Sequence, residues 1–351
     1  MYCLPLLSVI EYYFCNRVNS WKNKAKYYCS KCNDIFLLPH VHPLKGPVSI
    51  AELRRPTQLL APLTQKHSES QYWFSDESLR VLLIGIRNSR CNGVLCIGTP
   101  TVFEYLQSDK ELRAHCKSFL LDIDSRFVPF FRSSHFAVYS MLTNHFYDSR
   151  STTKLNAFFA TLNRLVIVCD PPFGVFMKPL KNSLNKLCKQ FFITGESYVS
   201  KHWCKSIIVL PVFVGRRFLA KTGFSMLDYK VFYLYRLFDK VISEFRSILE
   251  LLWGSLRNSG IRCEIRVCYV NHVKYKRPDK SVVRFFTDLP LDVFDLSEFS
   301  NYRFPIIDGY MHKHCDICCR CVKESYDHCG ACKRCHLPQR CPRILGVEAR
   351  N

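Results

Sequence analysis

The sequence predicts an α/β protein built on a doubly wound sheet of seven strands, with a small zinc-binding module near each end of the chain. Three observations support this fold class. Short apolar runs of strand length alternate with stretches of helical periodicity between residues 75 and 290. One such run ends in a glycine and the next ends in acidic residues, which is the order found in nucleotide-binding sheets. Cysteines and histidines gather within residues 29–42 and 314–341.

Composition and charge narrow the function classes. The chain has 351 residues, of which 48% are hydrophobic, so most of it is expected to fold. The formal net charge of +21 favours RNA or DNA as a partner, and a basic solvated surface is the alternative. No run of about 18 uncharged apolar residues is present, and Leu4–Ile10 lacks the flanks of a signal peptide. We therefore expect no membrane span, a cytosolic or nuclear location and reduced cysteines, and we assume a monomer.

The chain divides into three predicted units: residues 1–45 with a zinc knuckle, 46–300 as the nucleotide-binding domain, and 301–351 as a cysteine-rich tail. In the first unit, Cys29 and Cys32 form a Cys-x2-Cys knuckle, and His40 and His42 follow. These are four zinc ligands of the right type. The His-x-His spacing is tighter than usual, which leaves open whether one histidine binds or both. The alternative is a buried cysteine pair beside two surface histidines.

The central unit begins with a polar–aromatic cluster. Its members form either a lid over a cofactor or part of the core, and they are Gln71, Tyr72, Trp73 and Phe74. Ser75 and the acidic residues behind it predict the cap of a helix that runs to about Arg87. An apolar strand over 93–97 then ends at Gly98 and leads into a helix past Leu106, as in the first turn of a nucleotide-binding sheet.

The next two strands continue this pattern. The strand over 118–124 ends in the acids Asp122 and Asp124, where a carboxylate either binds ribose hydroxyls or caps a helix, and Asp122 is the first choice for the ribose. A third strand over 135–141 leads into residues 142–148, whose start is expected to lie over the adenine of a cofactor. The sequence therefore predicts a nucleotide-derived cofactor at this edge of the sheet.

A fourth strand over 165–169 ends at Asp170, Pro171, Pro172 and Phe173. Two prolines cannot extend the strand, so they hold this loop stiffly at the carboxyl end of the sheet. The Asp170 carboxylate and the Pro171 carbonyl can accept both hydrogens of an exocyclic amine, and Phe173 can stack on its ring. Asp/Asn-Pro-Pro-Phe/Tyr is the signature of S-adenosylmethionine-dependent amino-methyltransferases, and the alternative is an ordinary strand followed by a turn. The sheet is therefore expected to be a Rossmann-like methyltransferase sheet.

The later strands are expected over 206–213, 226–233 and 282–286, the last two as a closing antiparallel pair. An amphipathic helix is predicted over 237–256, inside an insertion over 235–268.

The tail carries a duplicated metal motif. His314-Cys315-x2-Cys318-x2-Cys321 recurs as His328-Cys329-x2-Cys332-x2-Cys335. One knuckle cannot fill a tetrahedral zinc, so we expect Cys315 and Cys318 to join His328 and Cys335 one period later. Likewise, Cys329 and Cys332 are expected to join Cys341 and His336. Cys321 has no evident partner set. Zinc in the tail either stabilises a segment that is too small to fold alone, or forms a surface that contacts RNA.

Taken together, these residues resemble the CCHC-type zinc-finger large-subunit rRNA N6-adenosine methyltransferase family. The resemblance runs from about Tyr27 to Cys341 and includes the Cys29/Cys32 knuckle, residues 53–60, 71–72, 94–100, 120–124, 170–174 and 226–229, and the His-Cys tail. The GRF-type finger that the family carries at its amino terminus is not seen in this sequence.

The resemblance implies S-adenosylmethionine and zinc as cofactors, and transfer of a methyl group to N6 of an adenosine in an rRNA hairpin, in nucleolus and cytoplasm. It also implies cofactor contacts from Gln71–Phe74, Gly98, Asp122, Asp124, Ser140, Met141, Leu142 and Thr143. Two other functions remain open. One is methylation of protein lysine by an enzyme of the Asp-Pro-Pro class, and the other is zinc and RNA binding without catalysis.

Overall fold

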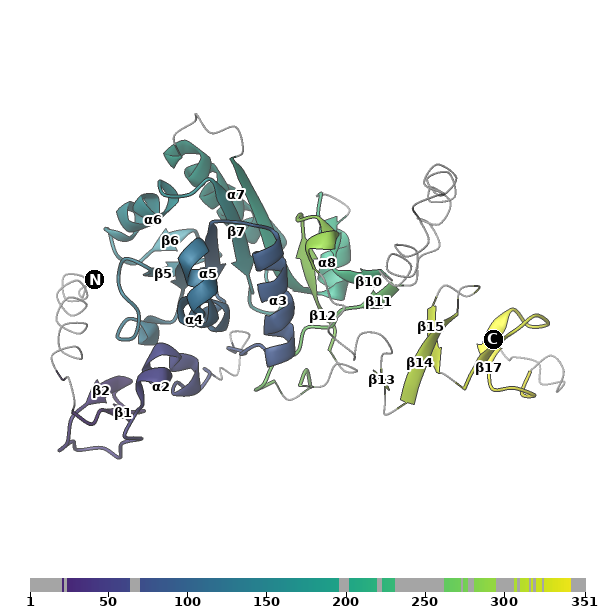
Figure 1. Cartoon of the computed structure of the whole chain (residues 1–351), viewed down its shortest axis with the longest axis horizontal. Coiled ribbons are helices and arrows are strands. Elements are labelled where there is room, and N and C mark those ends of the chain that lie inside the picture. Colours follow the sequence, from purple (N-terminus) through teal and green to yellow (C-terminus); the bar gives the residue numbers. More distant parts are fainter. Residues whose placement is uncertain are drawn as a thin grey trace.

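A computed structural model of the chain describes residues 21, 24–63, 70–195, 202–219, 223–230, 262–272, 274–276, 281–294, 306–307, 310–315, 317, 320–323 and 325–341. The predicted helix over 237–256 and Cys318 lie outside these residues, as do the side chains of Cys315 and Cys321. Figure 1 shows a central α/β domain, with the β1–β2 hairpin at one end and the β14–β17 strands at the other.

An eight-stranded sheet forms the centre of the molecule. From edge to edge it runs β6 (His145–Phe146), β5 (Phe136–Ser140), β4 (Lys117–Asp122), β3 (Gly93–Ile97), β7 (Arg164–Cys169), β8 (Trp203–Pro211), β12 (Val283–Thr287) and β9 (Ser225–Met226). Strands β5, β4, β3, β7 and β8 are parallel, whereas β12 is antiparallel to both of its neighbours. The doubly wound sheet is confirmed, and the two-residue β6 adds an edge strand to the seven expected.

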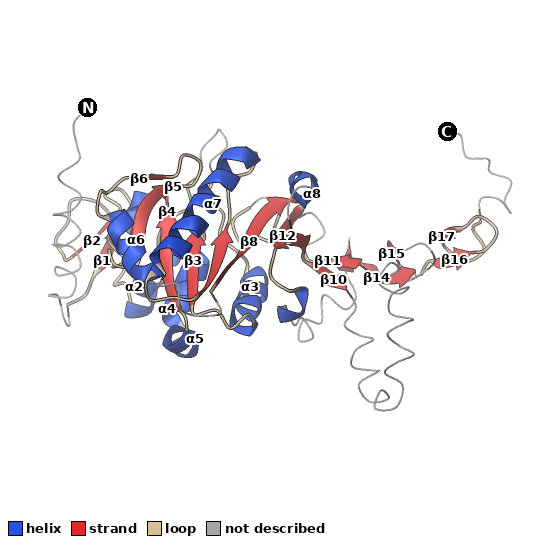
Figure 2. Ribbon diagram, turned by 90° about the horizontal axis from the view of Figure 1, so that it is seen from above, coloured by secondary structure: helices blue, strands red, loops and turns tan. Residues whose placement is uncertain are grey.

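Helices cover both faces of this sheet (Figure 2). Helices α3 (Asp76–Asn88), α4 (Pro100–Ser108) and α5 (Lys110–His115) share one hydrophobic cluster with the sheet, and α6 (Ser151–Phe159) and α7 (Met177–Thr194) share the other. Along β3, Val94 and Cys96 belong to the first cluster, whereas Leu95 and Ile97 belong to the second. Because side chains alternate along a strand, a run that is apolar at every position is buried on both faces.

Helix α3 begins where the sequence predicts. The Ser75 side chain accepts a hydrogen bond from the Ser78 backbone N–H, which satisfies one of the free donors of the first turn. The inner face buries Leu79, Leu82 and Ile86 to 2% exposure or less. Burial of each such side chain stabilises the fold by about 1.5–3 kcal/mol. This helix therefore fixes the segment before Ser75 against the sheet.

The expected strand over 226–233 is wrong in its extent. Strand β9 ends at Met226, and β10 (Asp228–Lys230) leaves the central sheet to pair with β11 (Arg262–Glu264). Leu227 is buried between them and still bonds to Phe285 of β12 through its backbone N–H. Beyond β11, Ile265 and Val267, which close the predicted insertion, are fully buried in the core. The domain boundaries themselves remain predictions.

The remaining elements are short. They are β1 (Tyr27–Cys29), β2 (Asp34–Phe36), α2 (Ile50–Arg54), η1 (Pro56–Gln58), η2 (Ser125–Phe127), α8 (Val212–Leu219), η3 (Leu291–Val293), β13 (Ile306–Ile307), β14 (Tyr310–Cys315), β15 (Arg320–Lys323), β16 (Asp327–Cys329) and β17 (Arg334–His336). Among the described residues, no helix has both the length and the apolar character needed to cross a membrane.

Candidate active site and metal centres

A cavity of about 440 Å³ opens at the carboxyl ends of β3, β4, β5 and β7. It brings together most of the side chains that the sequence predicts for a cofactor and for catalysis. These are Gln71, Tyr72, Trp73, Gly98, Asp122, Asp124, Ser140, Met141, Leu142, Asp170, Pro171, Pro172 and Phe173. Two predicted residues do not line it, because Phe74 is buried in the core at 4% exposure and Thr143 is exposed beyond the end of β5.

Gly98 shapes the floor of this cavity. Its φ of +64° lies in the left-handed region, which residues with a side chain rarely adopt. A Cβ here would lie 2.8 Å from Met141 Cε and 2.9 Å from the Asp170 carbonyl oxygen. The Asp170 backbone N–H also donates to the Ile97 carbonyl at 3.1 Å. Only glycine therefore lets the first turn of the sheet pass so close to the Asp-Pro-Pro-Phe loop.

The two acids at the end of β4 have different hydrogen-bond partners. Asp124 accepts hydrogen bonds from Gln71 Nε2 at 2.8 Å and from Arg126, whose Nη2 lies 2.7 Å from Asp124 Oδ2. Asp122 accepts the Asp124 backbone N–H at 2.9 Å, and burial raises the pKa of its carboxyl to about 7. Asp124 therefore anchors Gln71 to the sheet, and binding of a ribose by Asp122 stays a prediction.

The Gln71–Phe74 segment is held by a part of the chain about 200 residues later. Asn271 accepts the Trp73 backbone N–H at 2.8 Å and donates to the Gln71 carbonyl at 2.8 Å. The Val270 N–H donates to the Trp73 carbonyl, and Phe74 forms a bridge with Tyr269. Of the two alternatives left by the sequence, Phe74 packs in the core, whereas Tyr72 lines the cavity and its role as a lid over a cofactor stays a prediction.

The Asp-Pro-Pro-Phe loop presents its acid and its ring to the same cavity. Tyr269 donates a hydrogen bond from its hydroxyl to Asp170 Oδ1 at 3.1 Å. Burial raises the pKa of the Asp170 carboxyl well above its usual value, and the Tyr269 hydrogen bond opposes this rise. The Phe173 ring stacks on Tyr72, with centroids 5.4 Å apart and planes at 27°. A planar amine that enters the cavity therefore meets a hydrogen-bond acceptor and an aromatic surface together.

The sequence reasoning missed two residues of this site. Tyr269 reaches Asp170 from a segment 99 residues later, and Arg126 joins Asp124 to Gln71. The signal for Tyr269 is its position in Tyr269-Val-Asn-His-Val-Lys-Tyr275, which mixes aromatic and polar residues as Gln71–Phe74 does. This segment lies directly behind the predicted insertion, which separates it in the sequence from the other motifs of the site.

The amino-terminal knuckle has the geometry of a zinc site. The ligand atoms of Cys29, Cys32, His40 and His42 all lie within 4.8 Å of one another. In a tetrahedral zinc site with bonds of about 2.0–2.3 Å, ligand atoms lie about 3.3–3.8 Å apart. Here Cys32 Sγ lies 3.3 Å from His42 Nδ1 and 3.6 Å from His40 Nε2, and Cys29 Sγ lies 3.8 Å from His42 Nδ1.

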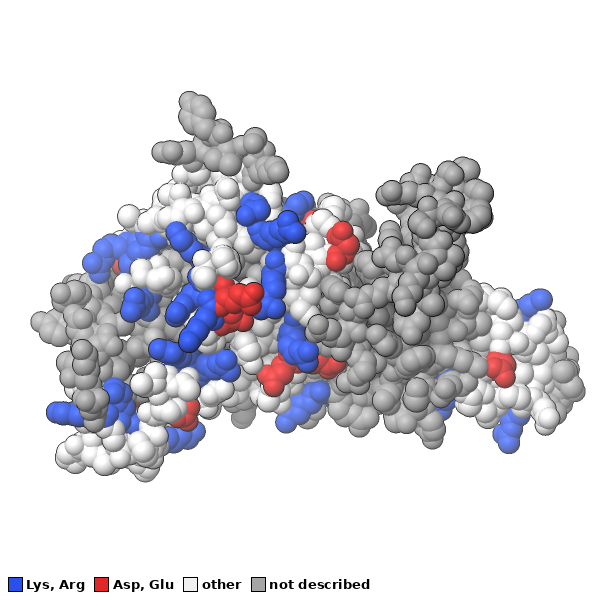
Figure 3. Space-filling view, viewed as in Figure 1, with Lys and Arg blue, Asp and Glu red and all other residues white. Residues whose placement is uncertain are grey.

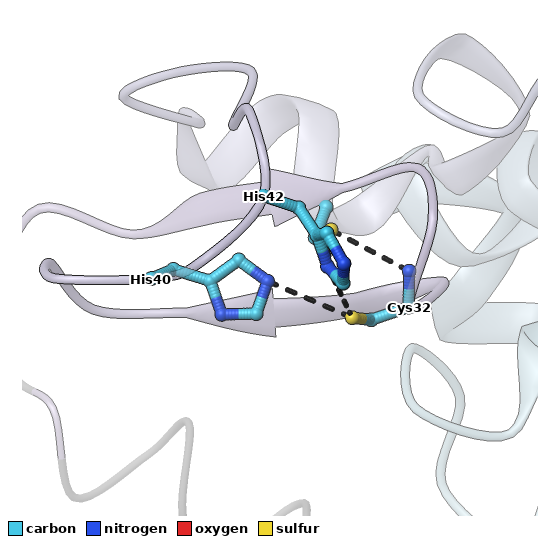
Figure 4. A group of neighbouring side chains, drawn as sticks. Cys32, His40 and His42 are labelled. Carbon is cyan, nitrogen blue, oxygen red and sulfur yellow. Dashed lines mark hydrogen bonds between the residues drawn. The ribbon is translucent and has the colours of Figure 1, made fainter.

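Both histidines reach this site, His40 with its Nε2 atom and His42 with its Nδ1 atom. Figure 4 shows that His40 and His42, which follow the β1–β2 hairpin in the sequence, both point toward Cys32. The His40 ring stacks on Phe36 of β2, with centroids 4.0 Å apart, which fixes its direction. The tight His-x-His spacing is therefore compatible with four ligands.

A second group of ligands lies in the tail, where Cys329, Cys332, His336 and Cys341 meet. Cys329 Sγ and Cys341 Sγ are 3.6 Å apart. His336 Nδ1 lies 2.7 Å from the Leu337 carbonyl, and its Nε2 is buried with no hydrogen-bond partner among the described residues. An imidazole whose Nδ1–H is bound to a carbonyl offers its Nε2 lone pair to a metal. This set of four is the one expected from the spacing.

The other predicted set in the tail is described in part. Cys335 Sγ lies 3.8 Å from His328 Nδ1, across the β16–β17 hairpin. Cys315 and Cys321 lie on the paired strands β14 and β15, and Cys318 lies outside the described residues. The proposed completion of His328 and Cys335 by Cys315 and Cys318 stays a prediction.

Comparison with known proteins shows the family of the chain. The family model described as "Probable N6-adenine methyltransferase" matches residues 65–249. The rRNA N(6)-adenosine-methyltransferase ZCCHC4 of Homo sapiens is 29% identical over 325 residues, which cover 88% of this chain and 54% of that protein. The protein of the same name from Xenopus laevis is 30% identical over 319 residues, or 86% of this chain and 55% of that protein. The chain thus spans about half the length of these relatives. With more than half of its residues matched by the family model, the chain belongs to the N6-adenine methyltransferase family.

Proposed function

We propose that this chain transfers a methyl group from S-adenosylmethionine to N6 of an adenosine in large-subunit rRNA. One observation carries the proposal: the Gly98 turn, the Asp122 carboxylate and the Asp170–Phe173 loop line one cavity of about 440 Å³. A turn and a carboxylate suited to a nucleotide-derived cofactor thus lie beside an acceptor and a ring suited to an adenine.

The residues of the loop would act mainly by orientation. Asp170 Oδ2 and the Pro171 carbonyl would accept the two N6 hydrogens, so that the nitrogen lone pair points out of their plane. Phe173 would stack on the base and hold it against the loop. Such placement supplies most of the acceleration for a transfer between two bound groups, and the attacked nitrogen becomes acidic only after transfer. No strong general base is required.

The chain's own residues fit the cofactor. Asp122 would accept hydrogen bonds from ribose hydroxyls, and the Gly98 turn leaves room for the cofactor beside Asp170. The cofactor supplies the electrophilic methyl group. Zinc, held by the two groups of four ligands, would stabilise small segments that have little core of their own.

An RNA substrate is supported by charge. The formal net charge is +21, and Lys and Arg outnumber Asp and Glu on the described surface that Figure 3 shows. The relatives are named as rRNA N6-adenosine methyltransferases. The adenine must leave its stack to reach the Asp170 loop, and this costs less free energy for an unpaired nucleotide in an RNA loop than for a paired one. We further propose action as a monomer, without membrane attachment, in nucleolus and cytoplasm.

The test is where the methyl group goes. The purified chain is incubated with labelled S-adenosylmethionine and either rRNA or total protein, and label is counted in each. We expect label in RNA, and little from Asp170→Ala. Label in protein alone would favour a lysine methyltransferase instead, and label in neither would favour a non-catalytic zinc and RNA-binding protein.

A further inference from the structure

We propose that Tyr269 is a positioning residue of this site: its hydroxyl occupies one oxygen of the Asp170 carboxylate, so that the other oxygen alone faces the amine of the substrate. This inference rests on the proposed function and adds a residue that neither the motif nor the family match assigns. It follows from three features of the pair, namely its contact, its surroundings and its charge.

The contact is direct, and the tyrosine that makes it is buried. Tyr269 Oη lies 3.1 Å from Asp170 Oδ1, Tyr269 is 1% exposed, and both residues line the same cavity. A carboxylate with two open oxygens can rotate and accept from either of them. The hydrogen bond from Tyr269 fixes the rotation of the carboxylate and takes one lone pair of Oδ1, which leaves Oδ2 as the oxygen with both lone pairs open to the N6–H of a bound adenine.

The surroundings fix the hydroxyl in place. Phe74 stacks on the Tyr269 ring with centroids 5.4 Å apart and planes at 18°. Phe173 meets the same ring edge-on at 6.0 Å and 75°, and the Tyr269 N–H donates to the Tyr275 carbonyl at 3.0 Å. Tyr269 therefore touches the acid and the stacking ring of the loop at once, and it has little freedom to turn away.

The charge of Asp170 explains why a donor is needed. While Tyr269 donates to Oδ1, a proton on the Asp170 carboxyl would sit on Oδ2 and point at the N6–H of the substrate, so the loop accepts the amine when Asp170 is ionised. Burial raises the pKa of Asp170, and the hydrogen bond from Tyr269 lowers it. Tyr269 thus keeps the acid in its accepting form over a wider pH range than burial alone would allow.

No other described group is placed to do this. Tyr72, Cys169 and Cys268 are titratable neighbours of the pair that carry no positive charge. The nearby histidine is His272, whose ring centroid lies 6.5 Å from that of Tyr269. Burial lowers the pKa of His272, and its Nδ1 accepts the Tyr275 backbone N–H at 2.9 Å, so it is directed away from the Asp170 carboxylate. Across the cavity lie Asp122 and the Asp124–Arg126 ion pair. Arg126 is the sole Lys or Arg among the described residues that line the cavity, and it is bound to Asp124 and Gln71.

Tyr269→Phe tests the proposal, because it keeps the packed ring and removes only the hydroxyl. The pH profile of kcat/KM for RNA is measured for the wild type, Tyr269→Phe, Asp170→Asn and the double variant, with S-adenosylmethionine at saturation so that ionisation of Asp122 does not contribute a limb. We expect Tyr269→Phe to move the acidic limb up by about one pH unit, which is a loss of about tenfold below the limb and much less above it. In the two chains that carry Asp170→Asn the limb is absent, and Tyr269→Phe shifts nothing. Tyr105→Phe, which removes a half-buried hydroxyl on α4 away from the cavity, is the control.

A second readout needs no substrate. In the chain with Asp170, Tyr269→Phe should lower the free energy of unfolding more at about pH 9 than at about pH 5. In the chain with Asp170→Asn, the same substitution should lower it equally at both pH values. If the wild type transfers no methyl group, the proposed function falls and these unfolding curves still decide the role of Tyr269. An unmoved acidic limb in an active enzyme, or equal losses at both pH values in the Asp170 chain, would overturn the proposal.

Discussion

Replacement of Gly98 by alanine tests whether the close approach of two loops builds the cavity. The φ of +64° costs a residue with a side chain about 1–2 kcal/mol. The added Cβ would also lie 2.9 Å from the Asp170 carbonyl, which is closer than real Cβ contacts come. Overpacking of this kind costs about 1–3 kcal/mol more, so Gly98→Ala should lose about 2–5 kcal/mol of unfolding free energy.

Gly174→Ala is the matched control for this variant. Gly174 also has a positive φ, of +86°, but a Cβ there would meet nothing within 4 Å. It should therefore lose only the backbone cost of about 1–2 kcal/mol. Chemical denaturation gives both values, and calorimetry with S-adenosylmethionine should show weaker binding for Gly98→Ala. Equal losses from the two variants would refute the view that the Asp170 loop presses against the first turn of the sheet.

Three further predictions concern ionisation and zinc. Burial raises the pKa of Glu104 from 4.5 to about 8. The contribution of neutral Glu104 to the free energy of unfolding should therefore be complete below about pH 4.5 and be lost progressively as the pH rises through 8. At about 1.4 kcal/mol per pKa unit, the total loss is up to about 5 kcal/mol. Glu104→Gln should remove most of that fall in denaturation curves, whereas a variant of the exposed Glu111 to Gln should keep it. Because the pKa of Asp122 is about 7, affinity for S-adenosylmethionine should rise as pH passes 7. Asp122→Asn should bind about tenfold more weakly with no such rise, and unchanged affinity in calorimetry would exclude Asp122 as the ribose ligand. Cys32→Ser and Cys332→Ser should each lower the bound zinc by one ion in metal analysis, whereas Cys188→Ser, which lies in neither group of ligands, should lower it by none.

Local patterns in the sequence were enough to locate the strands and the motifs. The run Leu165–Cys169 is apolar at every position because β7 is buried on both faces, and the two prolines that follow it end the strand at the edge where open α/β sheets generally bind ligands. Ser75 predicted the start of α3 through its side-chain cap. The spacing of Cys29, Cys32, His40 and His42 indicated a zinc site without knowledge of which ring nitrogen faces inward.

What the sequence did not predict depends on contacts between distant segments. The break after Met226 arises because Asp228–Lys230 pairs with β11, more than 30 residues later, and residue alternation alone cannot show such pairing. The sequence left Asp124 open as a second ribose ligand, whereas in the structure Arg126 and Gln71 hold its carboxylate. Phe74 turns toward the core because Tyr269 stacks on it. In each case a partner lies on another element.

The most direct test of the central claim is to measure N6-methyladenosine itself. RNA that has been incubated with the purified chain and S-adenosylmethionine is digested to nucleosides, and the modified adenosine is quantified by mass spectrometry. We expect N6-methyladenosine from the wild type and at least about 100-fold less from Asp170→Ala, because the loop then lacks its acceptor. The same yield from both chains would contradict the role of Asp170 as the group that orients the amine.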